Sequence, residues 1–152
     1  MNLAYANPYE CTGPAVRALS LVPAPQPATP AILIADDDDD VRDAIAFNLH
    51  MSGFDTIGVG DGQTALDIAL RQRPRMIILD VTIPYLDGLR VCHELHAHPN
   101  TAQIPIMMVS GHGQPDDVDR GYAAGADDYL VKPFRQAEML RRVNWLLQSC
   151  GR

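Results

Sequence analysis

The feature that most constrains the fold is a regular alternation, from Ala31 onward, of short apolar runs with longer amphipathic segments. Several runs are apolar at every position, which is typical of parallel strands that are covered by helices on both faces. We therefore expect five strands in a parallel sheet, at residues 31–35, 56–59, 76–79, 104–109 and 129–131.

Helical periodicity fills the segments between these runs. Val41, Ile45 and Leu49 recur every fourth residue, which places them on one face of a helix. Comparable stripes follow at Leu66, Ala69 and Leu70, at Leu89, Cys92 and Leu95, at Val118 and Tyr122, and at Leu140, Val143 and Leu147. Turn and capping residues predict helix starts at Asp61, Asp87 and Pro115 and helix ends at Gly53 and Gly125. Five strand–helix units in about 120 residues predict one doubly wound α/β domain over residues 31–150.

Residues 1–30 have a different composition. They hold six of the twelve prolines and six alanines, with almost no charge and no strand or helix period. We interpret this segment as a flexible Pro/Ala-rich leader. It lacks a basic region ahead of an apolar stretch, so a secretory signal is not indicated.

Composition excludes several classes of protein. No apolar run approaches the roughly 18 residues that span a bilayer, so no membrane segment is expected. The net charge of -7 argues against direct nucleic-acid binding by this chain. Cys11, Cys92 and Cys150 are odd in number and far apart, which indicates neither a disulfide framework nor a clustered zinc site. A reducing, cytoplasmic location is the expectation.

Charged and polar side chains follow four of the predicted strands. Asp36 and Asp37 come after the first strand, Asp80 after the third, Ser110 after the fourth, and Lys132, the single lysine, after the fifth. Ligands of doubly wound sheets bind beyond the carboxyl ends of the strands. The sequence therefore predicts that these side chains form one site.

The acidic residues of this site require a cation. Two carboxylates about 4 Å apart, at an effective dielectric near 20, repel by about 4 kcal/mol. Asp36, Asp37 and Asp80 are thus expected to bind a metal, and all-oxygen ligands favour Mg2+ over Zn2+. A magnesium ion with one lysine and one hydroxyl is suited to hold a phosphoryl group. A carboxylate is then the natural acceptor.

Four motifs resemble those of a known family. The segments 32–38, 77–88, 105–111 and 125–134 are similar, in order and spacing, to the response-regulator receiver domain of two-component signalling. The resemblance covers the chain from residue 31 to about 150. It implies a flavodoxin-like (βα)5 fold with strand order 2-1-3-4-5.

The resemblance also implies roles for the acidic residues. Asp80 is the expected phosphoacceptor. Its phosphoryl group would come from a histidine kinase, a phosphotransfer protein or a small acyl phosphate. Asp36 and Asp37 are expected to hold Mg2+ together with Asp80 and the backbone carbonyl of Thr82. Enzymatic activity is expected only as this transfer to the chain itself and as autodephosphorylation.

A second group of roles concerns the response to phosphorylation. Lys132 is expected to pair with the phosphoryl group, and Ser110 to move toward it. Tyr129 is the expected aromatic switch, which turns inward, and the Lys132–Pro133 peptide is expected to be cis. Thr82, Gly111 and His112 depart from the commonest family pattern. These three positions are predicted to modulate the lifetime of the phosphoryl group.

The expected output surface comprises the helix near Val118, the strand at 129–131 and the last helix. It would act by self-dimerisation or by binding a protein target, with exchanged ion pairs among Asp127, Asp128, Arg135, Arg141 and Arg142. Taken as a complete chain, the protein would be a single-domain regulator. As part of a longer one, its segment 125–129 looks like that of DNA-binding transcriptional regulators.

Three alternatives compete with this interpretation. Asp38, Asp39 and Asp40 are best explained as a solvated turn in which Asp38 or Asp39 caps the following helix. A haloacid-dehalogenase-type phosphohydrolase needs an acid two residues after its aspartate, where this chain has Thr82. A phosphorylation-independent interaction module with the same fold is the alternative function that stays open.

Overall fold

Five parallel strands form one sheet in the computed structural model, which describes residues 30–150. The strand order is β2-β1-β3-β4-β5, as predicted. The strands are β1 (Ile32–Ala35), β2 (Thr56–Val59), β3 (Met76–Asp80), β4 (Ile106–Ser110) and β5 (Asp128–Val131). The order changes direction at β1 and β3, so the crevice between their carboxyl ends is the expected ligand position.

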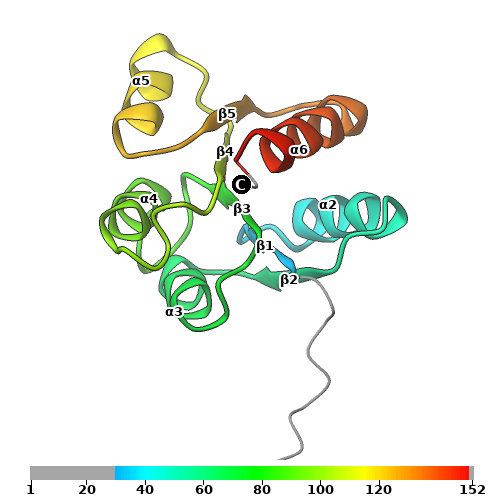
Figure 1. Cartoon of the computed structure of the whole chain (residues 1–152). Coiled ribbons are helices and arrows are strands. Elements are labelled where there is room, and N and C mark those ends of the chain that lie inside the picture. The colour runs from blue at the N-terminus through cyan, green and yellow to red at the C-terminus, as the bar shows by residue number, and fades with distance from the viewer. Residues whose placement is uncertain (1–29, 151–152) are drawn as a thin grey trace, which may run out of the picture.

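Helices cover both faces of this sheet (Figure 1). They are α2 (Asp39–Met51), α3 (Gly62–Gln72), α4 (Gly88–Ala97), α5 (Pro115–Ala123) and α6 (Gln136–Cys150). Helices α2 and α6 lie on one side of the sheet, and α3, α4 and α5 lie on the other. The doubly wound α/β architecture is therefore confirmed.

Alternation along the strands divides the core into two layers. Ile32 and Ile34 of β1 pack toward α2 and α6, in a cluster that includes Ile45 and Val143. Leu33 and Ala35 point to the opposite face and pack against α3 and α4. Both layers are apolar, which explains why the strand sequences show no polar alternation.

Strand β4 begins later than predicted. The apolar run starts at Ile104, but the strand starts at Ile106. Pro105 has no N–H to donate to a strand ladder, so pairing begins after it, although its carbonyl accepts from Ile77 N (3.0 Å). The other strand bounds differ from the prediction by at most one residue.

Helix starts follow the predicted capping residues. Asp38, Asp61 and Asp87 each accept backbone N–H groups of the following helix, which offsets its unsatisfied first turn. Helices α2 and α5 end just before Gly53 and Gly125, which have φ of +90° and +112°. Only glycine adopts such angles without strain.

The leader prediction for residues 1–30 lies outside the described residues except at Pro30. Among residues 30–150, no helix combines the length and the apolar character that a membrane crossing needs.

Candidate functional site

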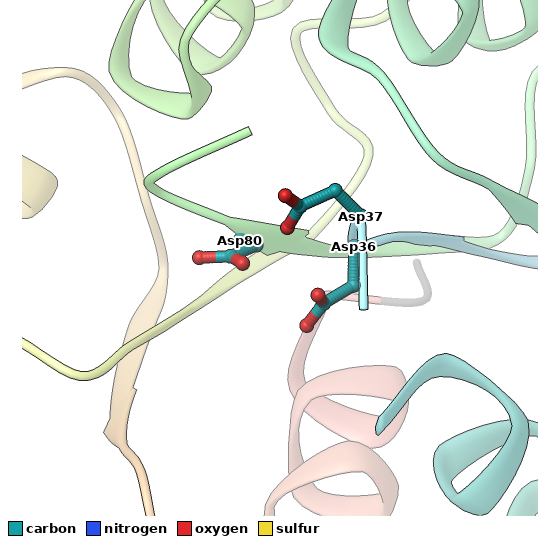
Figure 2. Close-up of side chains that lie close together, drawn as sticks. All are labelled: Asp36, Asp37 and Asp80. Carbon is teal, nitrogen blue, oxygen red and sulfur yellow. The ribbon is translucent and has the colours of Figure 1, made fainter. Parts of the chain in front are cut away.

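The parallel register brings the first and third strand ends together. Ala35 of β1 is the register partner of Leu79 of β3, so the next residues, Asp36 and Asp80, lie side by side. Asp37 adds a third carboxylate, and Figure 2 shows the three side chains gathered at this edge. One oxygen from each of the three lies within 4.8 Å of the others.

Backbone donors hold two of these carboxylates in the protein interior. Asp36 and Asp80 are only 2% and 4% exposed. Oδ1 of Asp36 accepts the N–H of Asp38 (2.9 Å). Oδ1 of Asp80 accepts the N–H of Thr82 (3.1 Å) and its hydroxyl (3.4 Å). Asp37 is exposed to solvent.

Lys132 is the cation of the site. Its Nζ lies 2.9 Å from Oδ2 of Asp36 and 3.3 Å from Oδ2 of Asp80. The residue reaches this point from the end of β5, where its N–H donates to the carbonyl of Ser110 (2.7 Å). The peptide that follows, Lys132–Pro133, is cis.

The charges of this cluster are not balanced. Burial, and then repulsion by Asp36, raises the pKa of Asp80, although Lys132 counteracts both. Burial alone would lower the pKa of Lys132, but its contacts with Asp36 and Asp80 raise it overall. One ammonium thus faces three carboxylates, and a further cation would relieve the remaining repulsion.

The donor set fits a hard divalent cation. All three side-chain donors are carboxylate oxygens, one of them exposed, so a bound ion could retain water molecules. No cysteine or histidine belongs to this cluster, which argues against zinc at this position.

The end of β4 forms the third part of the site. Ser110 is fully buried, and its Oγ accepts the N–H of His112 (3.0 Å). The hydroxyl of Tyr129 donates to the carbonyl of His112 (2.7 Å). Tyr129 is only 6% exposed, so its ring already lies inward in this structure. A Cβ at Gly111 would contact no atom within 4 Å.

Two contributions to the site were not predicted. Arg42 donates to the carbonyl of Asp36 (2.7 Å) and pairs with Asp39, and its side chain lies over Gly58. The sequence indicated only the ion pair of Arg42, through the i, i+3 spacing of Asp39 and Arg42 on one helix. Gly88 lies so close to β3 that a Cβ there would approach the carbonyl oxygen of Asp80 to 2.3 Å.

Two charged residues of the predicted output surface, Asp128 and Arg142, pair with each other within the chain. Arg142 donates to Asp128 (2.7 Å) and to Glu138 (2.9 Å). Asp127 instead accepts the N–H of Ile106 (2.9 Å), at the start of β4. Asp127 therefore has a structural contact that the sequence interpretation did not include.

Comparison with known proteins identifies the family. Residues 32–144 match the response regulator receiver domain. The chain is 42% identical over 123 residues to the DNA-binding dual master transcriptional regulator RpaA of Synechocystis sp.. That match covers 81% of this chain and 51% of RpaA, so the chain spans about half the length of this relative.

Solved structures agree with this match. A putative response regulator from Chloroflexus aurantiacus superposes with a TM-score of 0.75 at 34% identity, over 79% of this chain and 98% of that one. The receiver domain of a sensor histidine kinase from Pseudomonas aeruginosa, solved with a magnesium ion coordinated in its active-site cleft, gives 0.72 at 32% identity. That comparison covers 82% of this chain and 100% of the Pseudomonas one. The chain therefore belongs to the response-regulator receiver domains of two-component signalling.

Proposed function

We propose that this receiver domain accepts a phosphoryl group on Asp80 from a phosphohistidine of a histidine kinase or phosphotransfer protein. Response-regulator receiver domains are not classical enzymes, and the proposed chemistry is confined to the chain's own aspartate. The observation that supports it best is a buried carboxylate, Asp80, within 3.3 Å of the single lysine and beside two further carboxylates.

The transfer is a direct displacement at phosphorus. A carboxylate oxygen of Asp80 attacks the phosphorus atom as the bond to the imidazole nitrogen breaks. The bonding electron pair stays on the imidazole, and Asp80 becomes an acyl phosphate. Lys132 is placed to pair with the new phosphoryl oxygens. In autodephosphorylation a water oxygen attacks the same phosphorus, which releases inorganic phosphate and restores the carboxylate.

Magnesium is the cation that we propose for this chemistry. Asp36, Asp37 and Asp80 would hold it, with the backbone carbonyl of Thr82 as a further ligand. When bound, it neutralises charge on the phosphoryl oxygens. Support comes from the oxygen-only donor set, and from the Pseudomonas receiver domain, which holds magnesium in its cleft.

A pocket beside Lys132 is the proposed contact for the phosphodonor protein. Its volume is about 520 Å3, and it opens between α2 and the segment after β5. Phe47 and Met51 continue the face of α2 on which Ala44 lines the pocket, and they are 64% and 70% exposed. Because Lys132 itself lines the pocket, a partner bound there could present its phosphohistidine to Asp80. The lining residues are Asp40, Val41, Ala44, Lys132, Pro133, Phe134 and Gln136.

The consequences of phosphorylation are part of the same proposal. The added charge would draw Ser110 away from His112 N and toward the phosphoryl group. Tyr129 would then respond through its bond to the His112 carbonyl. The surface of α5, β5 and α6 would carry the change to a target or a second copy, in a cytoplasmic pathway. Thr82, Gly111 and His112 would set the phosphoryl lifetime.

The test uses a small donor, which requires no partner. Wild type, Asp80→Asn and the exposed control Asp43→Asn are incubated with acetyl phosphate, with Mg2+ or with EDTA, and intact mass is followed. We expect one added phosphoryl group in wild type and in the control, only with Mg2+, and none in Asp80→Asn. Incorporation into Asp80→Asn would refute the assignment of Asp80. No incorporation into wild type would favour a phosphorylation-independent interaction module.

A further inference from the structure

Asp36 is held through both its backbone and its side chain. Its N–H donates to the carbonyl of Val59 in β2 (3.1 Å), and its Oδ1 accepts the N–H of Asp38 (2.9 Å). Its Oδ2 lies 2.9 Å from Nζ of Lys132. The remaining polar group, the backbone carbonyl, accepts from the guanidinium of Arg42 (2.7 Å). Of these four contacts, the last acts directly on the next residue along the chain.

The carbonyl of Asp36 belongs to the same peptide unit as the N–H of Asp37. A peptide unit is planar, so an orientation imposed on that carbonyl also fixes the N–Cα bond from which Asp37 continues. Asp37 is exposed, whereas Asp36 and Asp80 are buried, yet its carboxylate lies within 4.8 Å of theirs. The position of Asp37 therefore depends on its backbone more than on side-chain packing.

Arg42 is fixed by its own neighbours. It belongs to the first turn of α2, where it pairs with Asp39, and its side chain is only 20% exposed. A Cβ built on Gly58 of β2 would lie 3.1 Å from Cδ and 3.3 Å from Nε of Arg42, and one built on Gly60 would lie 3.5 Å from Nη1. Any larger residue at 58 would thus press on the arginine. Glycine weakens a strand, and the gain at Gly58 is the room for this side chain.

The charge of Arg42 by itself would oppose metal binding, because a guanidinium repels a divalent cation. Here the guanidinium donates to a carbonyl and pairs with Asp39, which is not one of the three clustered carboxylates. Its charge is thus matched outside the site, while its hydrogen bond acts on the site's backbone. Charge and geometry predict opposite effects of its removal, so the two roles can be separated.

We propose that Arg42 is a positioning residue for the metal site: its guanidinium joins the Asp36 carbonyl to Asp39 and so holds the peptide from which Asp37 reaches toward Asp80. The proposal rests on the function proposed above, and it adds a residue that is not itself a metal ligand. Gly58 takes part by leaving room for the arginine side chain.

The first test measures Mg2+ affinity in variants of the full chain, from amide NMR shifts during a titration with Mg2+. Arg42→Met keeps an unbranched side chain over Gly58 and removes both guanidinium contacts, so Kd should rise about 10-fold, as is typical when a residue that orients metal ligands is lost. Arg42→Lys keeps the charge but lacks the planar fork, so its Kd should rise by a similar factor. Arg90→Met, which removes an exposed ion pair on α4, should leave Kd unchanged.

The direction of the change distinguishes the possible roles. Tighter binding in Arg42→Met would mean that the guanidinium acts by charge repulsion, and an unchanged Kd would mean that it only supports the fold. Either result would overturn the proposal. A wild-type Kd in Arg42→Lys would also overturn it, because the fork would then be unnecessary. Urea midpoints in EDTA establish that each variant is folded.

The second test displaces Arg42 without changing it. Gly58→Val, at an exposed position of β2, is made in wild type and in an Arg42→Ala background. In wild type, we expect Kd for Mg2+ to rise toward that of Arg42→Met. In the Arg42→Ala background, Kd should not change further, and the urea midpoint should rise because valine is favoured in strands. No effect on Kd in wild type, or an equal increase in both backgrounds, would contradict the proposal.

The two proposals fail in different ways. A wild type that binds no Mg2+ would refute the metal site of the proposed function. A wild type that binds Mg2+ and gains one phosphoryl group from acetyl phosphate, with the same Kd in Arg42→Met, would refute the role of Arg42 alone.

Discussion

Replacement of Lys132 by methionine removes the cation between two buried carboxylates. The ammonium lies 2.9 Å from Asp36 and 3.3 Å from Asp80, and each contact is worth about 5 kcal/mol at an effective dielectric near 20, before desolvation is subtracted. Removal of one partner from a buried ion pair costs about 3–5 kcal/mol. Because the lysine side chain is 24% exposed, we expect the lower end of that range, about 3 kcal/mol.

The measurement is urea unfolding followed by circular dichroism, in EDTA at pH 7. With an m-value of about 1.5 kcal/mol/M, the midpoint should fall by about 2 M. Arg90→Met is the matched control, since Arg90 and Glu94 form an ion pair whose side chains are 62% and 42% exposed. Its loss should cost less than about 0.5 kcal/mol.

The pH dependence has a definite sign. The folded-state pKa of Lys132 is raised, so its charge stabilises the fold fully below its ordinary value of 10.5 and ceases to do so as pH rises through the higher folded value. On the acid side, the raised pKa of Asp80 means that this carboxyl is neutralised early. The difference between wild type and Lys132→Met should therefore shrink as pH falls, and it should also shrink in saturating Mg2+. A variant as stable as wild type in EDTA at pH 7 would refute the reasoning.

Three further predictions concern other parts of the fold. Tyr85 has φ of +69° and is 91% exposed. Tyr85→Gly should raise the free energy of unfolding, measured in urea, by about 0.5–1 kcal/mol, because glycine adopts this angle without strain. Tyr85→Ala keeps the backbone strain and should not raise it. Gly62→Ala would place a methyl group 1.7 Å from the carbonyl oxygen of Leu86, so it should lower the free energy of unfolding by about 2–3 kcal/mol. A methyl group at Gly111 would meet no atom within 4 Å, so Gly111→Ala should change that free energy by less than about 0.5 kcal/mol. Similar losses of stability in the two variants would contradict the packing argument. Burial raises the pKa of Cys92 to about 12 from an ordinary 9.0, so its alkylation by iodoacetamide at pH 8 should be about 1,000-fold slower in the folded protein than after unfolding. A folded-state rate near that of a free thiol, measured with the other two cysteines replaced by serine, would contradict that burial.

Much of the architecture follows from the sequence because its signals are local and repeated. A strand that is apolar on both faces must be covered by helices on both sides, and this condition alone favours a parallel, doubly wound sheet. Aspartates at helix starts, such as Asp61 and Asp87, act on their own first turn, so they could be located without knowledge of the rest of the fold.

The start of β4 was predicted less well, since an apolar run shows which residues avoid water but not which of them pair. Pro105 lies within the apolar run, but it lacks the backbone N–H that strand pairing needs. Asp127 was assigned to a surface ion pair, whereas it accepts a strand N–H from a residue 21 positions earlier. Such a partner is fixed only when two distant segments meet.

The sequence by itself determined the order of the elements, the edge of the sheet at which Asp36, Asp80, Ser110 and Lys132 collect, and the family to which the chain belongs. These depend on periodicity and on motif spacing, which are properties of the linear chain. Only the tertiary structure decided that Lys132 bridges two buried carboxylates and that Arg42 lies over Gly58. The physical reason is that burial, charge balance and steric room depend on atoms brought together from distant segments, and no local pattern encodes those distances.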